Sequence, residues 1–268
     1  MDAPTLDDLP DHFYKYRSLQ SSQAQFTQDI LTKSELYWAS PLSFNDPFDC
    51  APVHVLAGSR VKKELAIRRI IRNGMPFLSR HEVKARTLEA MLRPPQAIED
   101  MMSELQARFM ANTGVCCLST IPDNILMWSH YADSHRGICL RFTAEAKRSA
   151  YPNLDDLHFE LSFPVQYSDL RPEINILWKD RTDLLEKMLL IKADFWSYEH
   201  EWRMFRSNAG PGTHKFPSQC LDGIIFGARS TADDGKMVGK WLKDRQHPVK
   251  MYQANFSKKF FRLNIGEL

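Results

Sequence analysis

One short stretch constrains the fold of this chain more than any other. Residues 196–203 read Trp-Ser-Tyr-Glu-His-Glu-Trp-Arg. In a β-strand successive side chains point to opposite faces of the sheet, which predicts one charged face and one largely apolar face. The charged face carries Glu199, Glu201 and Arg203, and the other face carries His200, Trp202 and Met204. The charged face is either the solvated side of a half-buried antiparallel strand or the wall of a polar site, with its two acids about 7 Å apart.

Composition limits the class of protein. At 268 residues, with 43% hydrophobic and 25% charged residues, the chain resembles an ordinary soluble globular protein with ample material for a core. No window approaches the roughly 20 apolar residues of a membrane helix, and the acidic N-terminus does not resemble a secretory signal. The five cysteines are odd in number and lack C-x-x-C spacing, which favours reduced thiols. We therefore expect a cytoplasmic protein with no membrane partner.

The hydrophobic patterning predicts strands alternating with a few helices. We expect helices that begin at Ser21 or Ser22, at about residue 180 and at Thr231. We expect strands at residues 12–17, 35–40, 114–119, 136–142, 158–167, 196–204, 221–227, 249–253 and 260–265. Residues 60–112 are helical in pattern, with breaks near 74–76 and 94–95. The chain thus predicts one α+β domain over residues 1–268, with a helical insert at about 60–112.

The helical insert carries an uneven charge. Residues 60–93 contain ten Lys or Arg residues and three Glu residues, which gives a local charge of +7 with histidines neutral. A solvated helix surface explains such a run in most proteins. The alternative is a contact with nucleic acid or another acidic partner.

Two further segments combine polar and aromatic residues. Residues 44–49, Phe-Asn-Asp-Pro-Phe-Asp, form a turn-rich loop in which Asn45 and Asp46 can bond their own backbone, either as a structural turn or as part of a site. Residues 124–131 include Trp128, His130 and Tyr131, as core or as pocket wall. A zinc site is disfavoured because adjacent strand cysteines point to opposite faces. Its candidate ligands would be Cys116, Cys117, His130, His135 and Cys139.

Several separated motifs together resemble a bacterial family known only as domain of unknown function 2971. They are residues 14–17, 44–49 and 126–131 with His135 and Gly137, and residues 198–203. A more distant resemblance is to ADP-ribosyltransferases of the arginine-serine-glutamate type. It rests on Arg17 at the end of a first strand, Ser40 at the end of a second, and the pair Glu199 and Glu201 on a late strand. The middle motif departs from that family's Ser-Thr-Ser, since this chain has Ala39-Ser40-Pro41.

The second resemblance implies a split, mostly antiparallel α+β fold around a cleft for NAD, which is a substrate. It implies that Arg17 clamps the pyrophosphate, that Ser40 steadies the catalytic acid, and that Glu201 is that acid. Glu199 would orient the acceptor. With these two residues, Arg17 and Ser40, we expect further side chains to contact NAD, namely Tyr16, Tyr37, Asn45, Asp46, Trp128, His130 and Tyr131.

Elementary chemistry agrees with these roles. Cleavage between nicotinamide and ribose develops oxocarbenium-like positive charge, which a nearby carboxylate stabilises. A guanidinium donates two parallel hydrogen bonds to a pyrophosphate. Tyr16, Tyr37 and Trp128 offer ring faces for nicotinamide or adenine.

Three classes of function follow. The first is an NAD-dependent ADP-ribosyltransferase or NAD glycohydrolase acting on a nucleic-acid or protein acceptor, such as a toxin or phage-defence effector. It needs no metal. The second is a metal-dependent nuclease or phosphodiesterase that uses Asp46, Asp49, Glu199 and Glu201 as oxygen ligands. The third is a non-catalytic module that binds a nucleotide or a partner protein.

Overall fold

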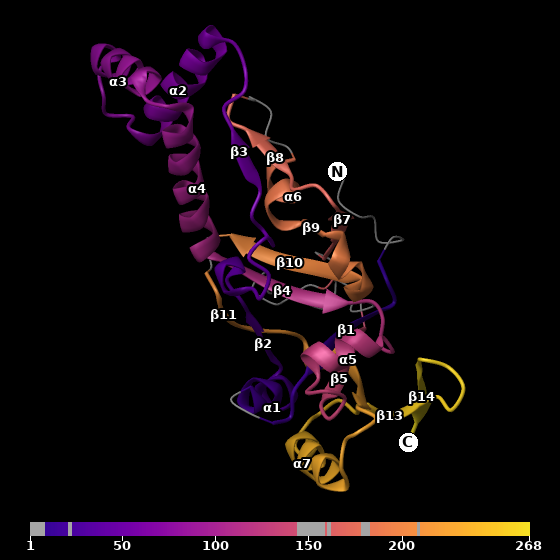
Figure 1. The fold of residues 1–268 in the computed structure, drawn as a ribbon. Helices are drawn as coiled ribbons and strands as arrows, with labels where there is room; N and C mark the ends of the chain where they lie inside the picture. The colour runs from indigo at the N-terminus through magenta and orange to yellow at the C-terminus, as the bar shows by residue number, and fades with distance from the viewer. Residues whose placement is uncertain (1–8, 21–22, 144–158, 160–161, 178–182, 208–209) are drawn as a thin grey trace.

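A mostly antiparallel sheet of eight strands forms the centre of the molecule (Figure 1). The computed structural model describes residues 9–20, 23–143, 159, 162–177, 183–207 and 210–268. The strand order is β14-β13-β12-β5-β1-β4-β10-β6, and of its neighbouring pairs only β12 and β13 are parallel. The α+β class with a mostly antiparallel sheet is therefore confirmed.

The central strands are β1 (His12–Arg17), β4 (Thr113–Ser119), β5 (Ile138–Thr143), β6 (Phe163–Pro164), β10 (Glu201–Ser207), β12 (Leu221–Phe226), β13 (Lys250–Phe256) and β14 (Leu263–Glu267). Three two-stranded pairs accompany them: β2 (Glu35–Trp38) with β11 (Gly212–Lys215), β3 (Val53–Val55) with β8 (Glu173–Asn175), and β7 (Gln166–Ser168) with β9 (Ile191–Ala193). The α-helices are α1 (Ala24–Lys33), α2 (Arg60–Gly74), α3 (Arg80–Leu92), α4 (Pro95–Ala111), α5 (Ile125–Tyr131), α6 (Leu184–Leu189) and α7 (Ala232–Leu242). The 3₁₀ helices are η2 (Pro41–Ser43), η5 (Asp194–Glu199) and η6 (Ser218–Cys220). None of the described helices is both long and apolar enough to cross a membrane.

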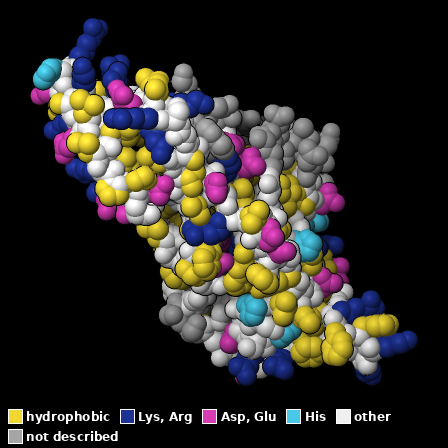
Figure 2. All heavy atoms as spheres, turned by 45° about the horizontal axis from the view of Figure 1, so that its top comes forward, with side chains coloured by type: hydrophobic (Ala, Val, Ile, Leu, Met, Phe, Trp, Pro, Cys, Tyr) yellow, Lys and Arg dark blue, Asp and Glu magenta, His cyan; other side chains and the backbone are white. Residues whose placement is uncertain are grey.

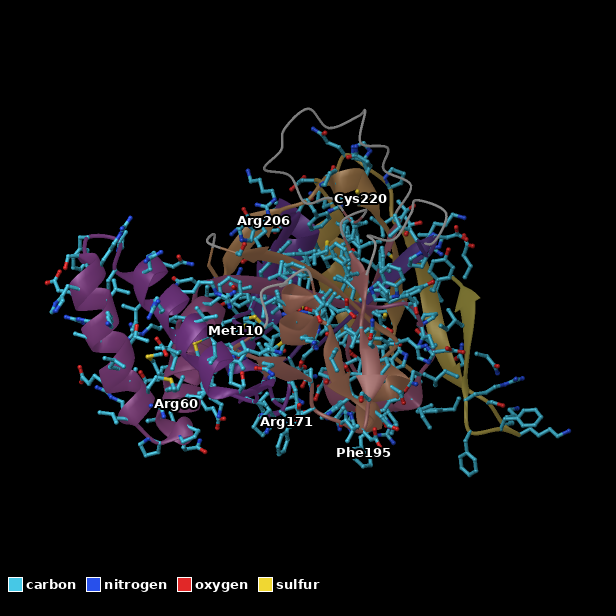
Figure 3. All side chains as sticks on the ribbon, turned by 90° about the horizontal axis from the view of Figure 1, so that it is seen from above. Arg60, Met110, Arg171, Phe195, Arg206 and Cys220 are labelled. Atoms are coloured by element: carbon cyan, nitrogen blue, oxygen red, sulfur yellow. The ribbon has the colours of Figure 1, made fainter. Side chains whose placement is uncertain are left out.

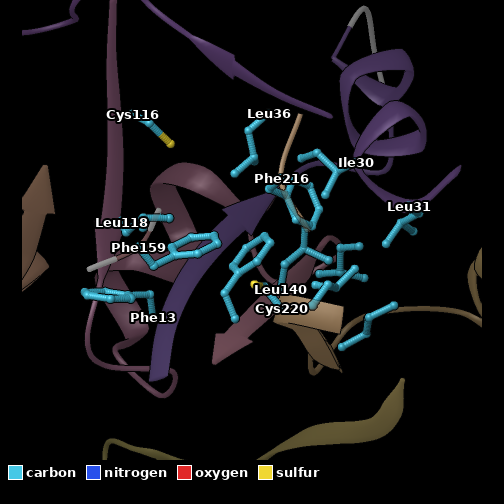
Figure 4. Close-up of a cluster of buried hydrophobic side chains, with 14 of the residues drawn as sticks. Phe13, Ile30, Leu31, Leu36, Cys116, Leu118, Leu140, Phe159, Phe216 and Cys220 are labelled. Atoms are coloured by element: carbon cyan, nitrogen blue, oxygen red, sulfur yellow. The ribbon is translucent and has the colours of Figure 1, made fainter. Parts of the chain in front are cut away.

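The alternation of β1 divides the core between two clusters of buried side chains. Phe13 belongs to the larger cluster, with Ile30 of α1 and Val238 of α7 (Figure 4). Tyr16 belongs to the other, with Trp128 of α5. Burying a large apolar side chain contributes about 1.5–3 kcal/mol, so β1 is fixed in register by both clusters. Its C-terminal residue, Arg17, is fixed with it.

In the predicted helical insert, residues 60–111 form the helices α2, α3 and α4, which are separated near residues 74–76 and 94–95. Helix α2 ends at Gly74. Helix α3 begins with a capping box formed by Ser79 and Glu82, and α4 begins at Pro95, directly after Pro94. Leu56, Ile67, Ile98 and Ile176 form its small core. Figure 1 shows α2 and α3 at the end of α4 that lies far from the central sheet.

The second half of the chain differs most from the prediction. Residues 196–204 are not one strand. They form the end of η5, then His200 in the left-handed region with φ 45°, then β10. Residues 124–131, for which no helix was predicted, form α5, because the Asn124 side chain accepts bonds from the first amides of the helix.

The remaining differences concern element bounds. The predicted helix from about residue 180 to 192 is described only from Asp183 onward. It ends at Leu189, because the next residues pair as β9 with β7. The predicted strand at 158–167 falls partly outside the described residues, and its later part divides between β6 and β7. Ser21 and Ser22, the predicted caps of the first helix, also lie outside the described residues.

Candidate functional site

The stretch that organises the sequence is a buried ionic cluster and not a solvated strand face. Arg203, on β10, is fully buried, and Glu201 and Asp49 are each more than nine-tenths buried. The Arg203 guanidinium donates from Nε and Nη2 to Glu201 at 2.8 and 2.9 Å, and from Nη1 and Nη2 to Asp49 at 2.9 and 2.7 Å. A buried charge is tolerated when it is paired and hydrogen-bonded in this way.

A second buried cation completes the cluster. Lys192, on β9, donates from Nζ to Glu199 Oε2 at 2.5 Å and to Glu201 Oε2 at 2.9 Å, and lies 3.6 Å from Asp49 Oδ2. Three carboxylates thus meet two cations. With every group ionised, the cluster carries one excess negative charge.

The backbone between η5 and β10 brings the two glutamates together. On a strand they would lie about 7 Å apart, but the left-handed turn at His200 lets both carboxylates reach the same ammonium. Glu199 also accepts a hydrogen bond from the Tyr131 hydroxyl at 2.6 Å. Ser119 Oγ donates to the Glu199 carbonyl at 2.7 Å, so β4 holds the end of η5.

The pKa values of the two acids shift in opposite directions. Burial alone would raise the pKa of Glu201, but Arg203 and Lys192 outweigh burial and lower this pKa to about 2. Burial raises the pKa of Glu199, and Lys192 only partly offsets it. Glu199 is therefore the acid of the pair with the higher pKa, and raised carboxyl pKa values are common among general acids and bases.

A cleft of about 210 Å³ opens beside the cluster. It is lined by Tyr14, Lys15, Tyr16, Arg17, Phe44, Asn45, Asp49, Cys117, Leu118, Ser119, Met127, Tyr131, Lys192, Glu199 and Glu201. The structure therefore brings Arg17 together with both glutamates, although 182 or more residues of sequence separate them.

A second hollow, of about 330 Å³, shares Lys15, Arg17, Phe44 and Cys117 with the first. Its far wall includes Phe26 and Tyr37, whose ring centroids lie 5.3 Å apart. The two hollows therefore adjoin at a pair of cations. One holds the acid cluster and the other an exposed aromatic pair.

Arg17 is half-buried, unlike the fully buried Arg203. Its Nε is buried and has no hydrogen-bond partner in the part of the chain that the structure describes, and burial lowers the pKa of its guanidinium. Lys15 Nζ donates to the Cys117 carbonyl at 2.9 Å. Leaving a buried donor unpaired costs about 1–3 kcal/mol. A bound anion that accepts a hydrogen bond from Arg17 Nε would remove this cost. Gly137 permits this arrangement, because a Cβ there would collide with the Arg17 carbonyl oxygen.

The other residues predicted from sequence either line the two hollows or belong to the structure around them. Tyr37, Asn45 and Tyr131 line the hollows. Trp128 is fully buried and packs edge-on against Tyr16, whose centroid lies 5.3 Å away, so Trp128 belongs to the core. Tyr16 also lines the cleft, with its hydroxyl bonded to the Ile121 carbonyl.

Three predicted residues serve the surrounding structure. His130 is exposed and lies 3.1 Å from the Tyr198 hydroxyl. Asp46 accepts from Trp196 Nε1 at 2.8 Å and so anchors η5. Ser40 caps η2 and donates to the Met110 carbonyl at 3.1 Å, and the residues that line the two hollows do not include it.

Lys192 is the functional residue that the sequence did not indicate. It was expected on a helix, so its contacts with Glu199 and Glu201 were not predicted. Asp49 was considered only as a metal ligand.

The described residues include no group of three or more His, Cys, Asp or Glu side chains arranged to hold a metal ion. Asp49, Glu199 and Glu201 do converge, but the Lys192 ammonium occupies the point where a metal would lie.

Comparison with known proteins gives one match. Residues 127–204 match the model of a family described as "Protein of unknown function (DUF2971)". The match includes Tyr131, Lys192, Glu199, Glu201 and Arg203, whereas Arg17 and Asp49 lie outside it. No curated protein and no solved structure matches the chain.

Proposed function

We propose that the two adjoining hollows take NAD and that the protein breaks the bond between nicotinamide and ribose, as an ADP-ribosyltransferase or an NAD glycohydrolase. One observation carries the proposal. Two cations, Lys15 and Arg17, lie where the hollows meet, with an excess of buried acid on one side and an aromatic pair on the other. NAD has the complementary order of charges: a pyrophosphate at its centre, a cationic nicotinamide at one end and adenine at the other.

The pyrophosphate belongs at Arg17. Its unpaired Nε and the fork geometry of a guanidinium suit two phosphate oxygens. Lys15 adds a second positive charge beside it. The adenine then faces Phe26 and Tyr37, which are 41% and 44% exposed and so retain free ring surface.

The nicotinamide ribose belongs beside Glu199. As the glycosidic bond breaks, the sugar gains positive charge, and a carboxylate stabilises it most where water is excluded. Glu201 accepts three hydrogen bonds from Arg203 and Lys192, whereas each oxygen of Glu199 accepts only one, from Tyr131 or from Lys192, and so keeps a free lone pair. We therefore assign the contact with substrate to Glu199 and make Glu201 a positioning residue that holds Lys192. This assignment exchanges the roles that the family resemblance implied.

The resemblance to the ADP-ribosyltransferase fold is part of the same proposal. The mostly antiparallel sheet, with Arg17 at the end of β1 and Glu201 at the start of β10, supports it. We give Ser40 no role in NAD binding, because its hydroxyl caps η2 and donates to the Met110 carbonyl.

The acceptor, if there is one, has a candidate surface on α2 and α3. Lys62, Arg72, Arg80, Lys84 and Arg86 are exposed there, and Figure 2 shows Lys and Arg side chains gathered over this end of the molecule. An acidic acceptor, nucleic acid or protein, fits this charge. A role as a toxin or phage-defence effector stays a prediction.

Nicotinamide release from labelled NAD tests the proposal. We expect release by the unaltered protein and a loss of about 100-fold or more in Glu199→Gln, since one lost electrostatic contact with the transition state has an effect of that size. Glu104→Gln, on the exposed face of α4, is the matched control and leaves the rate unchanged. A protein that neither binds nor consumes NAD, with or without a nucleic-acid or protein acceptor, would refute the proposal.

A non-catalytic nucleotide-binding module is the second candidate. The observation that favours it is that both oxygens of Glu201 and both oxygens of Glu199 already accept hydrogen bonds from side chains of the protein. Under this alternative NAD or another nucleotide binds, Arg17→Gln weakens binding, and no nicotinamide is released under any condition. A metal-dependent nuclease is not proposed, because its carboxylates are neutralised by lysine and arginine.

A further inference from the structure

The hairpin formed by β13 and β14 carries an exposed apolar tip. Its connecting residues 257–262 read Ser-Lys-Lys-Phe-Phe-Arg. Phe261 is completely exposed, at 101% of its reference area, and Phe260 and the preceding Phe256 are more than half exposed. Figure 3 shows this yellow hairpin extending away from the body of the molecule.

The conformation of the tip is fixed by hydrogen bonds. Ser257 N donates to the Arg262 carbonyl at 3.1 Å, and Arg262 N donates to the Phe260 carbonyl at 2.8 Å. Ser257 Oγ accepts from the amides of Lys259 and Phe260 at 3.3 and 3.1 Å. The phenylalanines are thus held outward by a structured turn.

Cations surround the aromatic rings. Lys258, Lys259 and Arg262 are exposed, and no acidic residue lies between Phe256 and Arg262. Lys259 Nζ and the Arg262 guanidinium lie 5.3 and 4.8 Å from the centre of the Phe260 ring. Arg229, also exposed, lies 5.9 Å from the Phe256 ring centre. Figure 2 shows hydrophobic and basic side chains gathered at the projecting corner at lower right.

We propose that this tip binds the surface of an anionic phospholipid bilayer. The apolar rings enter the boundary between headgroups and acyl chains, and the surrounding cations contact the lipid phosphates and carboxylates. Single-stranded nucleic acid is the competing partner, but it is bound in grooves with free ring faces. Here the tip projects, and cations already lie beside Phe260.

This contact differs from the membrane partner that the sequence analysis excluded. That expectation concerned spanning segments, whereas a peripheral contact needs only a few inserted side chains and positive charge. The inference is also independent of the proposed NAD chemistry, because it uses none of the residues that line the two hollows.

Vesicle flotation of the full chain tests it. We expect binding to phosphatidylcholine vesicles that contain phosphatidylserine, little binding to phosphatidylcholine alone, and weaker binding as salt rises. Phe261→Ser should lower the partition coefficient about tenfold or more, and Lys258→Glu about fivefold or more. Because these side chains are exposed, thermal unfolding should not change.

Phe77→Ser provides the matched control, since Phe77 is 81% exposed at the turn between α2 and α3. It should bind vesicles like the unaltered protein. Equal binding by Phe261→Ser and the unaltered protein, or no binding to phosphatidylserine vesicles, would overturn the proposal. So would loss of affinity for a labelled single-stranded oligonucleotide in Phe261→Ser without any vesicle binding.

Discussion

At the scale of single residues, the charges of the site are organised by Arg203. Its guanidinium donates to both oxygens of Asp49 and to both oxygens of Glu201. The sequence predicted that Glu201 and Arg203 share a face. It did not predict that this face is buried, because Asp49 lies 154 positions from Arg203 in the chain and Lys192 was expected on a helix.

Replacement of Arg203 should therefore destabilise the fold strongly. We expect Arg203→Met to lower the free energy of unfolding by about 3–5 kcal/mol, because two buried carboxylates lose their counterion. Urea unfolding measures it, with Arg108→Met on the exposed face of α4 as the control. A loss below about 1 kcal/mol would mean that the cluster is not buried as described.

Glu201 gives the protein a predictable acid sensitivity. Its pKa of about 2 in the fold lies below the value near 4.3 of an unfolded chain. Its stabilising contribution is complete above the unfolded value and is lost as the pH falls toward about 2. In urea unfolding across this range, Glu201→Gln should show a shallower loss of stability than the unaltered protein. Equal slopes would contradict the assigned ion pairs.

Tyr131 should influence the pKa of Glu199, the acid that we propose contacts the substrate. Its hydroxyl favours the ionised form of Glu199, so Tyr131→Phe should raise the pKa of Glu199 further. If the carboxylate is the active form, the acidic limb of the pH–rate profile for nicotinamide release moves to higher pH. If the acidic limb stays at the same pH, ionisation of Glu199 does not control the rate of nicotinamide release.

At the scale of elements, the structure joins α5 and η5 through one side chain. Asn124 caps α5 by accepting from the amides of Leu126 and Met127, and donates to the Tyr198 carbonyl at 3.0 Å. The sequence predicted the helical insert and most central strands, whose patterns are local. It missed α5 and the break at His200, because short elements depend on caps and on contacts with distant residues.

Loss of this cap should affect the site as well as stability. We expect Asn124→Ala to lower the free energy of unfolding by about 1–2 kcal/mol and to reduce nicotinamide release, since Tyr131 is on the same helix. Ser79→Ala, which removes the cap of α3, should have a similar effect on stability and none on the rate. Equal rates of nicotinamide release by the unaltered protein, Asn124→Ala and Ser79→Ala would mean that the position of α5 does not affect the reaction.

At the scale of the whole molecule, the sheet order places β1 beside β4 and β4 beside β10. This order brings Arg17 and the glutamates to one cleft, as the motif order in the sequence led us to expect. The excess of one acid over base within the buried cluster, and the second hollow beside the cleft, were beyond prediction, because both depend on side chains from many separate segments.

Calorimetric titration with NAD tests the central claim most directly, because the claim is that a dinucleotide spans Arg17. It is made on the Glu199→Gln protein, in which turnover is suppressed. We predict saturable binding of NAD and of ADP-ribose, weakened about tenfold or more when Arg17→Gln is added, since a charge-assisted bond contributes about 1.5–3 kcal/mol. No binding of either compound, or equal affinity with and without Arg17, would contradict the account.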